Sequence, residues 1–94
     1  MAHARIERQV VIANKKGLHA RPAALFVQIA SKYQSTVTIA NGAERVNGKS
    51  IMGLLMLGAQ YQTPLTITVD GEDAQLAIEE FEAFFAKQEE DLFT

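Results

Sequence analysis

Hydrophobic and polar residues alternate along several short stretches of the chain, a pattern typical of β-strands that bury one face. The alternation predicts four strands, over 5–13, 35–40, 43–47 and 65–69. Asn41-Gly42, between the second and third strands, is a strong signal for a tight hairpin, so these two strands are expected to pair. Glu44 and Arg45 indicate that the third strand is a solvated edge.

Other stretches carry hydrophobic residues every three to four positions, as helices with one buried stripe do. They predict helices over about 20–34 and 51–57, and a last helix that begins near 74. Pro22 suits the first turn of the first helix, Ser50 is a good N-cap for the second, and Gly58 closes that second helix. The stripe of the last helix is the widest and predicts core: Ala74, Ala77, Ile78, Phe81, Phe84 and Phe85.

The short middle helix is apolar nearly all round. We expect Ile51 and Leu54, with Leu55 beside them, to face the sheet, and Met52 and Met56 to form an exposed apolar patch. Neighbouring loops could cover such a patch. Alternatively it is a docking surface, because flexible Met side chains adapt to several partners.

The predicted order of elements is β-α-β-β-α-β-α, which indicates a two-layer α+β domain with all helices on one face of the sheet. Ninety-four residues, 48% of them hydrophobic, are enough for one small core without metal or disulfide cross-links. We therefore expect a single domain over 1–94, with loose termini at about 1–4 and 88–94.

Charge and composition exclude several classes of function. A net charge of −2 and a pI near 5.6 argue against general nucleic-acid binding. The absence of cysteine excludes disulfides and thiolate metal sites. Because the sequence carries no signal-peptide pattern and no long apolar run, we expect a cytoplasmic protein without membrane insertion.

The candidate chemistry lies in the stretch Gly17-Leu-His-Ala-Arg-Pro-Ala23. His19 precedes a helix whose first turn offers unpaired N–H groups and the positive end of the helix dipole. Arg21 adds a guanidinium fork suited to phosphate oxygens. A neutral imidazole is a nucleophile near pH 7. These residues could let His19 accept a phosphoryl group, although a histidine at a helix start is more often a cap or a surface residue.

Two blocks of sequence carry a family resemblance. Lys16-Gly-Leu-His-Ala-Arg-Pro-Ala23 is similar to the active-site signature of the HPr family, the histidine-phosphorylated carriers of the bacterial phosphotransferase system. Asn47-Gly-Lys-Ser-Ile-Met-Gly-Leu-Leu-Met-Leu-Gly58 resembles the regulatory-serine region of that family. The resemblance runs from about 5 to 85 and implies an open-faced β-sandwich with a four-stranded antiparallel sheet and three helices on one face.

The resemblance also implies roles for individual residues. His19 would receive a phosphoryl group on Nδ1 from enzyme I and pass it to IIA components of sugar permeases, and Arg21 would stabilise the phosphoryl oxygens. Ser50 would be a site for an HPr kinase/phosphorylase, with a transcriptional regulator as a further partner. The protein would be a carrier, not a free-standing catalyst, and would need no cofactor. Exposed apolar residues around the site would form the docking surface, namely Leu18, Ile51, Met52 and Leu55.

Several alternatives stay open at this stage. Within the same family, a carrier of the nitrogen-related branch would have a regulatory output, although the block around Ser50 is more similar to the sugar branch. A binding-only regulator of the same fold would lack phosphoryl transfer. A metal site made of His3 and His19 has too few ligands to be favoured. We expect a monomer, since a shuttle presents one face to many partners.

Overall fold

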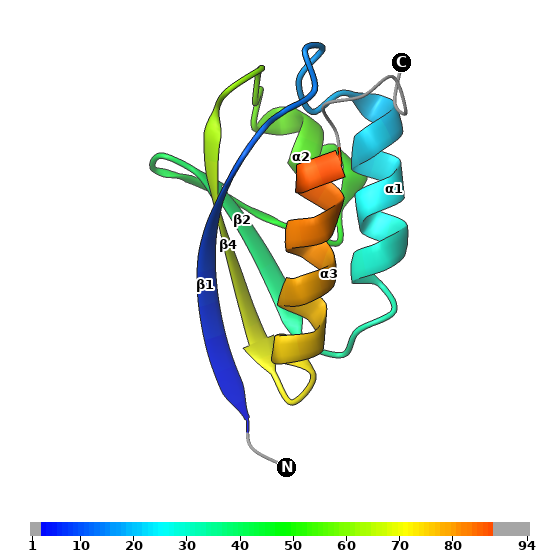
Figure 1. The fold of residues 1–94 in the computed structure, drawn as a ribbon, viewed down its shortest axis with the longest axis vertical. Helices are drawn as coiled ribbons and strands as arrows, with labels where there is room; N and C mark the ends of the chain where they lie inside the picture. The colour runs from blue at the N-terminus through cyan, green and yellow to red at the C-terminus, as the bar shows by residue number, and fades with distance from the viewer. Residues whose placement is uncertain (1–2, 88–94) are drawn as a thin grey trace.

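The computed structural model describes residues 3–87 of the chain. Its elements follow the predicted order β-α-β-β-α-β-α (Figure 1). They are β1 (Ala4–Val11), α1 (Ala20–Ala30), β2 (Thr36–Asn41), β3 (Glu44–Asn47), α2 (Ile51–Met56), β4 (Pro64–Gly71) and α3 (Ala74–Ala86). No helix within the described range is long and apolar enough to cross a bilayer.

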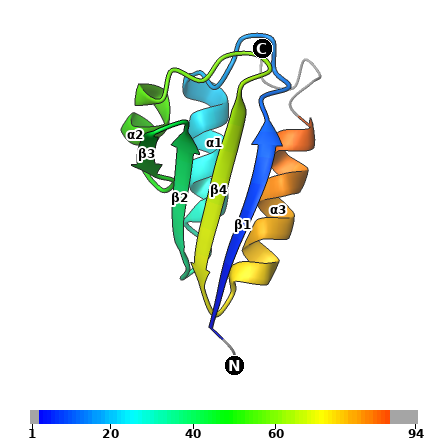
Figure 2. The same ribbon diagram turned by 90° about the vertical axis from the view of Figure 1, so that its left-hand side faces the viewer.

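The four strands form one antiparallel sheet in the order β1-β4-β2-β3. The register places Ile6 opposite Val69, and Val69 opposite Val37, so these side chains share one face. The helices all lie against that face, and Figure 2 shows the opposite face open. The predicted α+β sandwich with helices on one side is therefore confirmed.

Aromatic rings from α1 and α3 fill the space between the helices and the sheet. Phe26, Phe81 and Phe85 are almost wholly buried, and the Phe26 and Phe81 ring centroids are 4.8 Å apart. Burying one such side chain contributes about 1.5–3 kcal/mol. The predicted stripe of α3 is core, as expected from its spacing.

Two elements end earlier than predicted, because side chains or neighbouring loops capture their backbone groups. α1 ends at Ala30, because the Lys32 and Tyr33 amides donate to carbonyls only three residues back. The next two amides, of Gln34 and Ser35, donate to the Asp73 carboxylate. β1 ends at Val11, and Ile12 exchanges backbone hydrogen bonds with the 62–63 loop instead. Ile12 is still fully buried.

The first strand also begins earlier than expected. Ala4 already pairs with Gly71 as the first residue of β1, one residue before the predicted start. His3 contacts the Asp70 side chain. The prediction for 88–94 falls outside the described residues.

Candidate functional site

His19 is the N-cap residue of α1 and has an extended backbone, with φ −92° and ψ −171°. Its carbonyl oxygen accepts the Ala23 N–H at 3.0 Å, which starts the helix. Its side chain makes no capping hydrogen bond and is half-buried. A histidine at a helix start commonly caps the helix with its side chain, but the His19 ring does not.

The Gly17 carbonyl orients the His19 ring. It accepts the His19 backbone N–H at 3.1 Å and lies 3.1 Å from Nδ1. Because a carbonyl oxygen only accepts, Nδ1 carries the hydrogen in this contact. Reaction at Nδ1, which the family resemblance implies, requires the ring to leave this carbonyl.

A second loop holds the segment that presents His19. The Leu18 N–H donates to the Ala59 carbonyl at 3.0 Å. Gly17 has φ +75°, and a Cβ at this position would lie 2.7 Å from the same Ala59 oxygen. Only glycine fits both the backbone conformation and the close approach.

Asn14 shapes the same loop from inside. Its side-chain oxygen accepts the Lys16 N–H at 3.1 Å, and its backbone carbonyl accepts the Gly17 N–H at 2.8 Å. The side chain is buried, and its Nδ2 has no hydrogen-bond partner among the described residues. The sequence pattern did not single out Asn14. The available signal was the residue type, because an Asn side chain in a loop readily accepts the backbone N–H two residues on, as in an Asx-turn.

The start of α1 provides the features expected for holding an anion. Arg21, two residues after His19, is exposed, and Pro22 in the first turn is buried. The first turn contains no acidic residue. The backbone amides of Ala20 and Arg21, ahead of Pro22, which has no N–H, lie at the positive end of the helix dipole. His19, Arg21 and these amides can together bind and stabilise a phosphoryl group.

Leu18 corrects one prediction. It was expected to be an exposed docking residue, but only 5% of its surface is accessible. The backbone bond to Ala59 directs this residue into the core, so its exposure was predicted wrongly.

The exposed apolar patch on α2 consists of Ile51, Met52, Leu55 and Met56, with Leu54 buried beneath it. Met52 and Met56 are 71% and 72% exposed, as predicted. Ile51 and Leu55 are 41% and 38% exposed, so the expectation that they face the sheet with Leu54 is wrong, and Leu54 alone is buried. α2 packs beside α1, the helix that begins at His19 (Figure 1).

Ser50 is the N-cap of α2, as predicted. Its backbone is extended and its Oγ accepts the Gly53 N–H at 2.9 Å. The neighbouring Lys49 ammonium donates to the Tyr33 carbonyl at 2.7 Å. A half-buried serine with this cap geometry has a structural role, whatever else it does.

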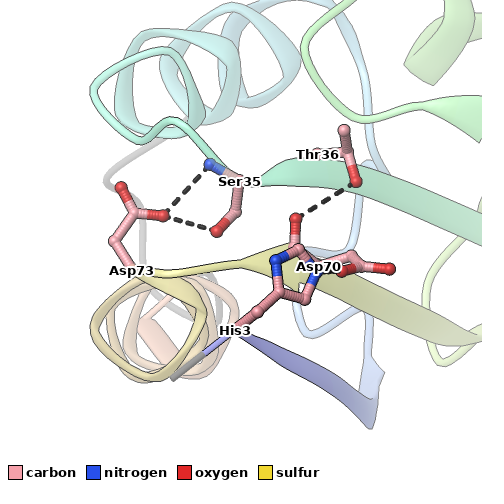
Figure 3. A network of polar contacts seen from close by, with 5 residues as sticks. All are labelled: His3, Ser35, Thr36, Asp70 and Asp73. Atoms are coloured by element: carbon pink, nitrogen blue, oxygen red, sulfur yellow. Dashed lines mark hydrogen bonds and ion pairs between the residues drawn. The ribbon is translucent and has the colours of Figure 1, made fainter. Parts of the chain in front are cut away.

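The two histidines are not brought together. His3 lies against Asp70 where β4 ends and α3 is about to begin, as Figure 3 shows, whereas His19 begins α1 after the loop that follows the other end of β1. Among residues 3–87, no group of three or more metal-ligating side chains is present.

Comparison with known proteins agrees with this geometry. The family model described as "PTS HPr component phosphorylation site" matches residues 6–87. Phosphocarrier protein HPr of Xylella fastidiosa (strain 9a5c) is 40% identical over 80 residues, which cover 85% of this chain and 90% of the relative. The HPr-like protein Crh of Bacillus subtilis (strain 168) is 44% identical over 83 residues, which cover 88% and 98% of the two chains.

Solved structures give the same result. HPr-C-His from Thermoanaerobacter tengcongensis has a TM-score of 0.87 at 40% identity, and the match covers 93% of this chain and 99% of that one. HPr from Bacillus anthracis str. Ames has a TM-score of 0.83, also at 40% identity, and the match covers 87% and 98%.

Proposed function

Because the chain belongs to the HPr family of phosphocarrier proteins, we propose that His19 accepts a phosphoryl group from enzyme I and passes it to IIA components of sugar permeases. The observation that carries the proposal is the position of His19. It stands at the start of α1 with a ring that does not cap the helix, next to Arg21 and the amides of the first turn.

The proposed transfer is a displacement at phosphorus. The ring turns away from the Gly17 carbonyl, and the Nδ1 proton is lost to water. The Nδ1 electron pair forms the new bond to phosphorus, while the bond to the donor group of enzyme I breaks and its electron pair returns to that group. Arg21 and the first-turn amides stabilise the negative charge on the phosphoryl oxygens. Transfer to a IIA component is the same step in reverse, and none of it requires a cofactor.

The exposed patch on α2 is proposed as the docking surface shared by enzyme I and the IIA components. It is small and apolar, and its two Met side chains are largely exposed. A small interface without charged anchors favours fast release, which a shuttle between partners needs. We propose that the carrier works in the cytoplasm as a monomer, although three similar structures, one of HPr and two of Crh, are described as dimers.

Ser50 is proposed as a regulatory phosphorylation site for an HPr kinase/phosphorylase. A phosphate there would meet the amide of Gly53 and the start of α2, so the helix can accommodate it. It would also place about two negative charges beside Ile51 and Met52, inside the docking surface. Phosphorylation of Ser50 should therefore slow phosphorylation of His19, and a transcriptional regulator could read the modified surface.

One observation favours a second function. The relatives include HPr-like protein Crh, and a similar structure is described as the Bacillus subtilis catabolite repression HPr. A chain of this type could act by binding a regulator, without transferring phosphoryl groups. The presence of both His19 and Arg21 favours the carrier.

A reconstituted transfer assay separates the two functions. The protein is incubated with labelled phosphoenolpyruvate, enzyme I and a purified IIA component, and label on the IIA component is followed. The carrier proposal predicts transfer by the parent protein and by His3→Ala, a matched histidine variant, but none by His19→Ala. Arg21→Ala should transfer roughly ten- to a hundredfold more slowly, the effect of losing one charge-assisted contact. Normal acceptance of label by His19→Ala would refute the carrier function.

A further inference from the structure

A hollow of about 390 Å³ lies on the open face of the sheet, where β2 meets the edge strand β3. The register places Thr38 opposite Asn47, and Ala40 opposite Arg45, so Arg45 and Asn47 share this face with Thr36 and Thr38. Lys49, just beyond the end of β3, and two valines, Val37 and Val46, complete the lining.

The polar lining of the hollow is suited to an anion. It includes one guanidinium, one ammonium, two hydroxyls and one amide, and no carboxylate. Glu44 is the acidic residue of β3, and strand alternation directs its side chain to the opposite face of the sheet from Arg45. The cations in the hollow are therefore not neutralised from within it.

Carboxylates elsewhere on the open face already have partners. Asp70, the β4 residue directly opposite Thr36, contacts His3 with its side chain. Glu7, on the far strand β1, lies 3.5 Å from the Thr68 hydroxyl. Neither lines the hollow. The positive charge there is consequently available to a ligand.

One of the two cations is held in place in advance. The Lys49 ammonium donates to the Tyr33 carbonyl at 2.7 Å, which fixes the end of a flexible side chain. An ammonium has three donors, so two remain for a ligand. Fixing it in the free protein lowers the entropy cost of binding.

We propose that this hollow is a binding site for a small phosphate-bearing anion. The Arg45 guanidinium would take two phosphate oxygens through its fork, and Lys49 would provide a second, fixed positive charge. The Thr38 hydroxyl would donate to a further oxygen, and the Thr36 hydroxyl, which donates to the Asp70 carbonyl at 3.4 Å, would turn from it to do the same. This site is distinct from the start of α1, because none of its residues belongs to the segment 14–23.

Residue-resolved NMR tests the proposal, with pyrophosphate as the probe and sodium acetate at equal ionic strength as the control salt. Pyrophosphate should shift the backbone amides of 36–38 and 45–49 in a saturable way, and acetate should not. Amides near His19 are followed in the same spectra, so binding at the start of α1 is scored separately.

Two charge variants test whether Arg45 binds the pyrophosphate. Arg45→Gln should weaken binding in the hollow by roughly tenfold or more, the usual effect of losing one charge-assisted contact. Arg5→Gln removes an exposed arginine from β1, outside the hollow, and should leave binding unchanged. Thr38→Val, which keeps the shape of the side chain, gives a second test if Arg45→Gln perturbs the fold. Shifts confined to the start of α1, or equal affinity in the parent and Arg45→Gln proteins, would overturn the proposal.

Discussion

At the scale of single residues, the geometry of the site depends on Gly17 and its carbonyl. The residue occupies the left-handed region at φ +75°, and it packs against the Ala59 oxygen. Its own carbonyl accepts the His19 N–H and contacts Nδ1. A change at this glycine would therefore move the nucleophile as well as strain the loop.

Gly17→Ala tests this dependence. The substitution forces an L side chain into the left-handed region and against a backbone oxygen, so it should lower the free energy of unfolding by about 1–3 kcal/mol. It should also slow phosphorylation of His19 at matched folded fraction. Gly42→Ala is the control, because Gly42 has φ +61° but no atom within 4 Å of an added Cβ. Urea unfolding and initial rates with enzyme I give both readouts, and an unaltered rate in Gly17→Ala would show that the loop does not position His19.

The sequence led us to propose His19 and Arg21 but did not predict how the His19 ring lies. Residue type and spacing suggested the nucleophile and its cation, and the family resemblance made the proposal specific. The contact between Nδ1 and the Gly17 carbonyl depends on the backbone angles of a loop that is held by backbone hydrogen bonds to the 59–63 segment. Such contacts between distant segments leave no periodic signal, which is also why Leu18 was wrongly expected at the surface.

At the scale of elements, α2 has two features: a serine side chain that caps its first turn and an exposed apolar face. It has only six residues, so packing and capping must stabilise it more than helix propensity does. Leu54 supplies the buried contact and Ser50 the cap. The remaining apolar side chains of the helix face solvent.

Ser50 variants separate capping from regulation. Ser50→Ala removes the acceptor for the Gly53 N–H and should cost about 1 kcal/mol of stability while leaving phosphoryl transfer largely intact. Ser50→Asp keeps a good capping oxygen and so should keep the fold, but its charge should slow phosphorylation of His19 by enzyme I. Initial rates at matched folded fraction are the measurement. If the two variants reacted equally fast, Ser50 would be a cap only.

Met52→Glu tests the docking surface. A charge placed at a position that is 71% exposed should barely change the thermal midpoint, but it should weaken binding to enzyme I. Leu76→Glu is a matched control on α3, 65% exposed and outside the patch, and should bind like the parent. Titration calorimetry measures both affinities. Equal affinity for the two variants would remove Met52 from the interface.

Element boundaries show where sequence patterns stop being sufficient. The apolar spacing beyond Ala30 continues through Tyr33, which is why the helix was predicted to reach about 34. The helix ends sooner because its bonding pattern tightens to three residues at Lys32, and the carboxylate of Asp73, almost forty residues away, accepts the amides of Gln34 and Ser35. Hydrophobic periodicity carries no information about such a distant capping group.

At the scale of the whole molecule, two polar links connect the end of α1 to α3. The Ser35 hydroxyl and amide donate to Asp73, as Figure 3 shows. The Tyr33 hydroxyl donates to Glu80, which also pairs with Lys32 at 2.9 Å. The hydrogen bond to Glu80 raises the pKa of Tyr33 to about 12 and lowers the pKa of Glu80. These links fix the two helices against each other and hence the start of α1.

The Asp73 link predicts a pH dependence. Hydrogen bonds from the Ser35 hydroxyl, and then from the Gln34 amide, lower the pKa of Asp73 below its ordinary 3.8. A carboxylate whose pKa is lowered in the folded state stabilises the fold at pH values above its ordinary pKa. This stabilisation is lost as the pH falls through the ordinary pKa towards the lowered one. Asp73→Asn should therefore be less stable than the parent at pH 7, and the gap should narrow towards pH 2–3. Urea midpoints across pH check this, and a gap independent of pH would exclude a contribution from the Asp73 charge.

The global topology was only partly accessible from sequence. Periodicity predicted the four strands and three helices, and Asn41-Gly42 predicted the β2–β3 hairpin, which the pairing confirms. The position of β4 between β1 and β2 joins segments far apart in the chain. Strand periodicity gives the face of each residue but not the neighbour of each strand, so the sheet order required the structure.

The most direct test of the account is to locate the phosphoryl group after reaction with enzyme I and phosphoenolpyruvate. Intact-mass spectrometry counts the groups added, and ³¹P–¹⁵N NMR assigns the ring nitrogen that carries them. We expect one phosphoryl group, on His19, with the contact between Nδ1 and the Gly17 carbonyl broken in the product. A phosphoryl group on His3, or no modification under conditions where another HPr is fully phosphorylated, would contradict it.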